Sequence, residues 1–564
     1  MIDCLIIIFF VCLLDGIYLR FNILLIGDEY TSIAVPASFA GIDWTSLTGS
    51  QSFHGYGFTI FLTPIYKFFK DLNIYQAYLA QNLLIRCVNG VLVYFIVGHF
   101  LKNNRINKIT IAVLADICSF GFLGGVLLCG VEASMVTIVL AIVLLLLNSH
   151  GDLGKPSISI PIFFLSAYTI TLHARAVIFI SVILVIYLLW LVKNRSRYKG
   201  FIIYMCLFGL LLAIVGLTHK QILSFIFIPQ EKHGGAVGNT MSSFVNENVF
   251  AKLSPDMLVH VIEVFFAIMC SYIFYSFGII CPVVLVSIKA VIREIKSKSP
   301  DYSRIYVYLY IFLSWLVVVA MYSGKGAYEV YVRNNYKPLS FIRYGIPYAY
   351  VIIIIGFLLL LTEKENGKNI VLSLLVGLVL CKIYILAIAP QFVGRSQITY
   401  FQYFILGKAD KDFVSYFTLL FTLIVILSII VLLFSKFNKF LPYCLLLLYF
   451  GFSMIARYDN YTFWNDKYSE TYESINAASD KINNLDEAEK NDMDFYMLGD
   501  IGYCKSLQVL NAYIPFTYLR SADEINYIES DNPYIFTDTY IDSIDGWEIS
   551  ALDNNEYLLT LGSE

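Results

Sequence analysis

Long apolar runs separated by short polar connectors dominate the first 456 residues of the chain. A helix needs about 20 apolar residues to cross a bilayer, so this pattern predicts about 13 transmembrane helices. Their approximate ranges are 4–26, 76–98, 109–130, 131–148, 156–172, 175–192, 200–217, 259–288, 304–322, 345–361, 369–388, 413–434 and 440–456. The first run has no basic segment before it and no small-residue cleavage site. We therefore interpret it as a transmembrane helix and not as a signal peptide.

The pattern changes near residue 457, where the chain becomes acidic and polar. A helical period over 468–484 is followed by three strand-like runs at 494–499, 534–537 and 557–560, bounded by Asn, Asp, Pro and Gly. We expect two domains: a membrane module over 1–456, in which 27–74 forms the first outer loop, and a small α/β domain over 457–564.

Composition agrees with this division. Of the 564 residues, 58% are hydrophobic and 14% are charged, whereas a soluble domain carries roughly 25% charged residues. The fold class is therefore an α-helical polytopic membrane protein with a small C-terminal α/β extracytoplasmic domain. The net charge of −3 does not suggest a nucleic-acid partner, so we expect none. The 11 cysteines show no metal-ligand spacing, so neither a zinc site nor a disulfide framework is indicated.

Basic residues set the orientation, because cytoplasmic connectors carry an excess of Lys and Arg. The connectors after the second, sixth, eighth, tenth and twelfth predicted helices are all basic, and they share one side if the N-terminus is cytoplasmic. The chain then lies in the cell membrane with its C-terminal domain outside. The first loop, a loop over 218–260 and the tail also lie outside, so we expect the functional site at the outer face.

The first outer loop opens on an acidic pair, Asp28 and Glu29, at the end of an apolar run. A carboxylate at this position can accept a proton from a hydroxyl group or bind a divalent metal. It can also cap a helix end. The loop continues with Gly41 to Trp44 and then with Gly55 to Thr63.

This order of elements resembles the GT-C class of polytopic glycosyltransferases, in particular the branch of aminoarabinose and protein mannosyl transferases that uses lipid carriers. The resemblance covers the layout of residues 1–455, and its distinctive motif is the first loop. It implies that Asp28 is the catalytic base, with Glu29 beside it. The family has a Lys-Pro-Pro element where this chain has His54-Gly55-Tyr56-Gly57, which departs from the family's lysine contact to phosphate.

Other residues of the outer face complete the expected site. Arg343 and Tyr344 resemble an Arg-Tyr pair that precedes a proline-containing helix in the family, and a guanidinium there binds the carrier phosphate through charge-assisted hydrogen bonds. Arg175 either binds the same phosphate or extends to lipid headgroups. Glu132 either lies near the acceptor or stabilises a helix N-terminus. We assign Glu132 and Tyr344, together with His54 and Tyr56, to the substrate cavity.

The resemblance implies that a sugar moves from a polyprenyl-phosphate carrier to a glycan, lipid or protein acceptor of the cell envelope, with inversion. No cofactor is specified, and a divalent metal stays an alternative. Two other functions remain open: a polysaccharide polymerase or ligase, and a flippase or transporter of lipid-linked glycans. Asp116, in the third predicted helix, favours the transporter because a buried acid can relay protons. We expect Asp15 and Arg20 to form a structural pair within the first helix.

Overall fold

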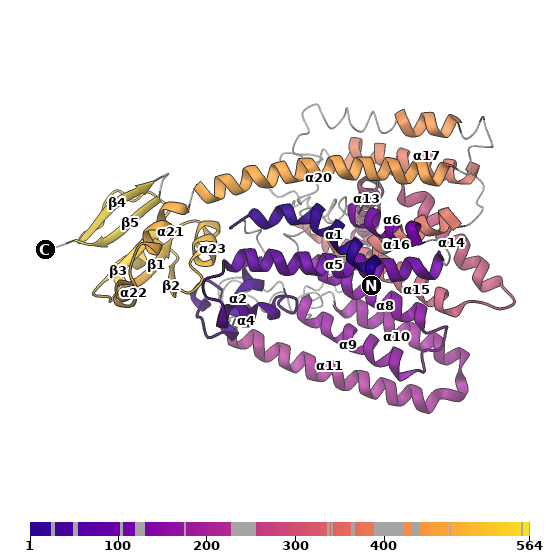
Figure 1. The fold of residues 1–564 in the computed structure, drawn as a ribbon, viewed down its shortest axis with the longest axis horizontal. Coiled ribbons are helices and arrows are strands. Elements are labelled where there is room, and N and C mark those ends of the chain that lie inside the picture. Colours follow the sequence, from indigo (N-terminus) through magenta and orange to yellow (C-terminus); the bar gives the residue numbers. More distant parts are fainter. Residues whose placement is uncertain are drawn as a thin grey trace. The chain divides into compact units, whose positions relative to one another are not determined.

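The computed structural model describes residues 1–23, 29–48, 55–101, 105–118, 130–173, 176–226, 255–334, 339, 342–362, 367–388, 422–430, 433, 440–473, 475–553 and 556–562. The chain forms two compact units (Figure 1). The first unit contains residues 1–15, 84–216 and 244–461. The second unit contains residues 16–83, 217–243 and 462–564. The predicted division into 1–456 and 457–564 stays a prediction.

Long apolar helices build the first unit. In the described part of the chain, seven helices are long and apolar enough to cross a membrane, and four apolar helices are shorter. The chain is therefore a helical membrane protein. Its long helices and their neighbours are α1 (Ile2–Asp15), α5 (Ile74–Phe100), α6 (Arg105–Cys118), α8 (Gly130–Asn148), α9 (Pro156–Leu172), α10 (Ala176–Lys193), α11 (Tyr198–Ile226), α13 (Pro255–Tyr275), α14 (Ile280–Lys296), α15 (Tyr302–Arg333), α16 (Ile346–Thr362), α17 (Gly367–Ile383) and α20 (Leu441–Glu473).

Three predicted boundaries in this region are wrong. The first helix was expected over 4–26, but α1 ends at Asp15 and a 3-10 helix follows over Gly16–Arg20. The loop expected from residue 218 starts later, because α11 continues to Ile226. The helix expected over 259–288 is broken into α13 and α14. Hydropathy averages over such breaks, so it locates an apolar region better than its ends.

Despite the break, α13 and α14 run one after the other along the length of α15. Tyr331, near the end of α15, donates a hydrogen bond of 2.5 Å to Glu263 in α13. At the start of α15, Arg304 lies 3.7 Å from Glu294, near the end of α14. Both helices therefore run antiparallel to α15, one after the other.

Glycine makes the break sterically feasible. Phe277 and Gly278 both have positive φ, at 54° and 77°, a backbone region that glycine adopts at little cost. A Cβ on Gly377 of α17 would lie 2.6 Å from the Gly278 carbonyl oxygen. The two backbones thus touch at the bend, and a side chain at residue 377 would force them apart.

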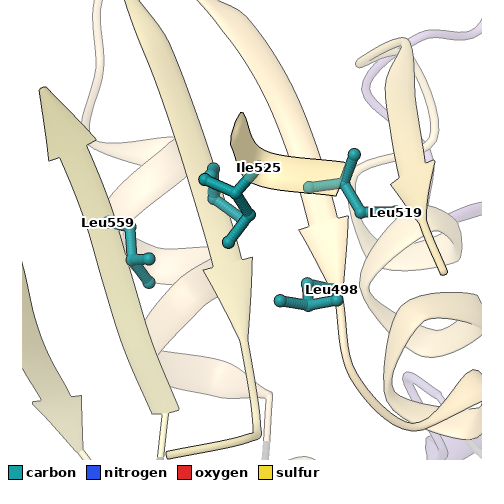
Figure 2. Packing of buried hydrophobic residues seen from close by; sticks show 5 residues of the cluster. Leu498, Leu519, Ile525 and Leu559 are labelled. Carbon is teal, nitrogen blue, oxygen red and sulfur yellow. The ribbon is translucent and has the colours of Figure 1, made fainter. Parts of the chain in front are cut away.

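The C-terminal part of the second unit is a five-stranded sheet with the order β2-β1-β3-β5-β4. Strands β2 (Phe516–Leu519), β1 (Asp494–Leu498) and β3 (Pro533–Thr537) are parallel. Strands β5 (Glu556–Leu561) and β4 (Trp547–Asp553) continue the sheet in antiparallel pairing. The helix α23 (Ile501–Leu510) connects β1 to β2. Leu498, Leu519, Ile525, Ile535 and Leu559 form a buried core, of which Figure 2 shows the packing.

The three strands expected in the tail are confirmed as β1, β3 and β5. The helical character expected over 468–484 is confirmed, since the range contains the end of α20 at Glu473 and α21 (Asn476–Asn483). Strands β2 and β4 were not predicted. The short helix α22 (Glu487–Asp492) precedes β1.

The first loop is more helical than its polar sequence predicts. It contains α2 (Glu29–Phe39), α3 (Thr45–Thr48), a 3-10 turn over Ile60–Leu62 and α4 (Thr63–Phe68). These elements belong to the second unit, as does the C-terminal sheet.

Candidate functional site

The acidic pair lies at the start of α2. Asp28 lies outside the described residues, and Glu29 is the first residue of the helix. The Glu29 side chain is buried, with 6% of its surface exposed. Its Oε1 accepts a hydrogen bond of 2.7 Å from the Tyr78 hydroxyl of α5. The positive end of the helix dipole also favours a carboxylate in the first turn. The Tyr78 hydroxyl therefore helps to hold the Glu29 carboxylate in position.

The loop segment Gly55 to Thr63 packs against α2 and forms a hydrogen bond to its backbone. Pro36 lies inside α2 and has no N–H to donate, so it cannot make the usual helical bond to the carbonyl of Ser32. Thr59 supplies the missing donor, and its hydroxyl lies 2.5 Å from that oxygen. The hydroxyl of Tyr66 donates to the next carbonyl, that of Ile33, over 3.3 Å. The segment after Gly55 therefore replaces part of the hydrogen bonding of α2.

The loop segment Gly41 to Trp44 also contacts α2, through Trp44. Trp44 is fully buried and stacks on Tyr30, with ring centroids 5.5 Å apart and planes 14° apart. Tyr66 also packs against the indole in an edge-on arrangement. Burial raises the pKa of Tyr30, so its phenol stays neutral. All three sequence elements of the first loop are thus brought together around α2.

Of the residues assigned to the substrate cavity in this loop, His54 lies outside the described residues. Tyr56 is buried and stacks on His219 of α11, with ring centroids 5.7 Å apart. The Tyr56 hydroxyl lies 3.3 Å from His219 Nδ1. The sequence analysis did not identify His219, because residue 219 was expected in a loop and not in a helix.

Residues close in sequence to the two predicted phosphate-binding arginines are in contact within the first unit. Arg175 lies outside the described residues, and Arg343 starts a 3-10 helix over Arg343–Gly345 although its side chain is not described. Their neighbours are in contact: the rings of His173 and Tyr344 have centroids 5.6 Å apart. Tyr344 also packs edge-on against Tyr322 of α15. The backbone before Arg343 is fixed by a 2.6 Å hydrogen bond from the Tyr272 hydroxyl to the Ile342 carbonyl.

Glu132 is in the first turn of α8 and is buried. Next to it, the carbonyl of Ala133 accepts a hydrogen bond of 3.1 Å from Asn89 of α5. This placement agrees with both readings of Glu132, an acid at a helix N-terminus and an acid near a substrate.

A buried cluster of four charged residues was missed by the sequence analysis. It contains Asp15 of α1, Arg86 of α5, Asp116 of α6 and Arg457 of α20, all of them in the first unit. Arg457 Nη2 lies 2.5 Å from Asp15 Oδ1 and 3.6 Å from Asp116 Oδ2. Arg86 Nη2 is hydrogen-bonded to Asp116, and its Nε lies 3.5 Å from Asp15 Oδ2. Two carboxylates and two guanidinium groups make the cluster electrically neutral.

This cluster corrects the expected pairing of Asp15 with Arg20, because Asp15 is bound by arginines from other helices. It also engages Asp116, which the sequence left available for a proton relay. The signal that could have identified Arg86 is its position within the apolar run 76–98, since a charge inside a membrane helix is usually paired.

Within the described residues, no group of three or more His, Cys, Asp or Glu side chains is arranged to hold a metal ion. Neither a protein-family model nor a curated protein matches this sequence.

Proposed function

We propose that this protein is a membrane glycosyltransferase of the GT-C class, with about 13 transmembrane helices. It transfers a sugar from a polyprenyl-phosphate carrier to a glycan, lipid or protein of the cell envelope. In this proposal the N-terminus is cytoplasmic, and the reaction takes place at the outer face of the cell membrane.

The chemistry requires a base and a cationic site. Asp28 takes the proton of the acceptor hydroxyl, whose oxygen attacks the anomeric carbon from the side opposite the phosphate. The bond from that carbon to the phosphate oxygen breaks, and polyprenyl phosphate leaves with an additional negative charge. Arg343 and Arg175 stabilise this charge. A single displacement inverts the anomeric configuration.

The observation that carries the proposal is the meeting of three separate loop elements around α2. Glu29 begins α2, Trp44 stacks on Tyr30 of this helix, and Thr59 donates to its Ser32 carbonyl. The contact between His173 and Tyr344 adds support, since these residues lie close to Arg175 and Arg343 in the sequence.

A flippase of lipid-linked glycans is the main alternative of another class. Its main support in the sequence was Asp116, and that carboxylate is occupied by Arg86 and Arg457. A polymerase or ligase uses similar lipid-linked substrates, but it would depend on arginines and not on Asp28.

The test is sugar transfer by the full chain reconstituted in proteoliposomes. A panel of polyprenyl-phosphate sugars, each radiolabelled in the sugar, is supplied with cell-envelope extract as acceptor. Asp28→Asn should lower transfer by about 100-fold or more, as expected when a general base is lost. The anomeric configuration of the product should be opposite to that of the donor.

Asp71→Asn is the matched control, because Asp71 is an exposed acid of the same loop. It should transfer sugar like the unmodified protein. Full transfer by Asp28→Asn would contradict the proposal, and translocation of a lipid-linked glycan without transfer would favour the flippase.

A further inference from the structure

The C-terminal domain and the first loop share buried contacts within the second unit. Strand β2 is an edge of the sheet, and Ser46 of α3 lies against it. The Ser46 hydroxyl donates to the Phe516 carbonyl over 2.8 Å and accepts from the Tyr518 amide over 3.3 Å. One side chain thus satisfies a donor and an acceptor that a neighbouring strand would otherwise satisfy.

Trp44 makes a second connection. Its indole Nε1 donates a hydrogen bond of 2.9 Å to the carbonyl of Ala512, in the segment between α23 and β2. The neighbouring residue, Tyr513, donates from its hydroxyl to the Tyr66 carbonyl over 3.2 Å. Because Trp44 also stacks on Tyr30, the C-terminal domain reaches the first turn of α2 through a single aromatic contact.

Lys505 of α23 makes a third connection, and it reaches the same tyrosine directly. The Lys505 side chain is largely buried, with 8% of the residue exposed. Its ammonium lies 6.0 Å from the centroid of the Tyr30 ring, which is within the range of a cation–π interaction. Tyr30 therefore contacts both an indole and an ammonium group, and it immediately follows the acidic pair in the sequence.

We propose that the C-terminal domain is a positioning module for the acidic pair, acting on Tyr30 through Lys505 and Trp44. This inference rests on the proposed function, since positioning has a catalytic effect only if the pair takes part in the reaction. Lys505 and Trp44 are positioning residues and touch no substrate. Holding Tyr30 fixes the first turn of α2, which presents Glu29 and follows Asp28.

The chemical reason for such a module is the sensitivity of proton transfer to geometry. A shift of about 1 Å in a reacting group lowers a rate by roughly 100-fold. The first turn of a helix has amide groups without intrahelical partners and frays readily. A stack and a cation on Tyr30 limit this fraying at the residue adjacent to the pair.

The experiment measures hydrogen exchange and sugar transfer on the same preparations of the full chain. Lys505→Met should raise the exchange rate of the α2 amides by about tenfold and lower kcat by a similar factor. KM for the lipid-linked donor should change by less than about twofold, because Lys505 is not expected to contribute to binding of the donor in the ground state. Lys505→Arg should restore both values, since a guanidinium also interacts with the ring.

Two further variants complete the design. Trp44→Phe keeps an aromatic ring on Tyr30 but removes the hydrogen bond to Ala512, and it should show a smaller increase in α2 exchange than Lys505→Met. Lys481→Met is the matched control, because Lys481 is an exposed lysine of α21 in the same domain. It should change neither quantity. Unchanged exchange in β1 and β3 will demonstrate that each variant has folded.

The two hypotheses fail in different ways. If Lys505→Met leaves the α2 exchange unchanged, the positioning role is wrong, even where kcat falls. If the unmodified protein transfers no sugar while Lys505→Met still loosens α2, the glycosyltransferase proposal is wrong and the mechanical connection stands.

Discussion

Asp15 and Asp116 in the first unit and Glu29 in the second unit are buried carboxylates with different hydrogen-bond partners. In the first unit, Asp15 and Asp116 are each bound by two arginines from other helices, and the four charges cancel. In the second unit, Glu29 accepts a hydrogen bond from the neutral hydroxyl of Tyr78. A neutralised cluster fixes helices but has little charge to offer a ligand. A hydroxyl group that donates to a carboxylate orients it without itself cancelling its charge.

The largest predicted effect concerns the neutral cluster. Arg86→Met leaves two buried carboxylates beside a single guanidinium, and should lower the free energy of unfolding by about 3–5 kcal/mol. The double variant Arg86→Met/Asp116→Leu leaves the neutral pair Asp15–Arg457 and should recover most of this loss. The measurement is denaturant unfolding in detergent. A double variant as unstable as the single one would show that charge balance is not the cause.

The next prediction concerns Glu29. Tyr78→Phe removes a donor from a buried charged acceptor and should cost about 1.5–3 kcal/mol of stability. A double-mutant cycle with Glu29→Gln isolates the contribution of this pair. If the cycle gives a coupling energy near zero, Tyr78 does not hold Glu29, and the contrast between the two units is weaker than described.

A smaller effect is expected where Pro36 interrupts α2. Thr59→Val leaves the Ser32 carbonyl without its hydroxyl donor and should cost about 1–2 kcal/mol. In a Pro36→Ala background the helix regains a backbone donor for the same carbonyl, so Thr59→Val should cost less there. Equal costs in the two backgrounds would mean that Thr59 does not compensate for the proline.

The smallest effect concerns a partly exposed pair in the first unit. Partial burial acts to raise the pKa of Asp152, but hydrogen bonds from Arg197 and the Gly154 amide lower it below its usual value. A carboxyl group with a lowered pKa contributes stability above its unfolded pKa, and this contribution disappears as pH falls through the folded pKa. Arg197→Met should therefore cost less than about 1 kcal/mol at pH 7, because water screens the pair.

The check is a comparison of unfolding at neutral pH and at about pH 3, below the model-peptide value for aspartate. The difference between the unmodified protein and Arg197→Met should shrink on acidification. A difference that grows at low pH would contradict the assignment of the shift to Arg197.

Much of the fold could be predicted from local patterns. Apolar runs located the membrane helices, and the runs at 494–499, 534–537 and 557–560 gave three of the strands. Strand β2 (Phe516–Leu519) was missed because it is only four residues long and lies at the edge of the sheet. There, part of its backbone hydrogen bonding is made by the Ser46 side chain and not by another strand. The position of the break at Gly278, within the irregular stretch 259–288, could not be predicted because it depends on close contact with Gly377.

The residues of the candidate site likewise fall into those that local sequence could identify and those that it could not. The order of elements in the first loop identified Glu29, Trp44 and Tyr56 as residues to examine, because these lie close together in the sequence. Lys505, His219 and the partner of Asp15 could not be found this way. Arg457 lies more than 400 residues from Asp15, and a single sequence contains no information about which distant helices pack together.

The contact of Ser46 with β2 has a practical consequence for anyone who dissects this protein. An uncovered sheet edge pairs readily with strands of other molecules. A fragment that begins near residue 457 would lack Ser46 and expose the Phe516 carbonyl and the Tyr518 amide. Such a fragment should self-associate or aggregate when it is expressed alone, so crystallisation of the tail will require residues 29–69 to be supplied as well.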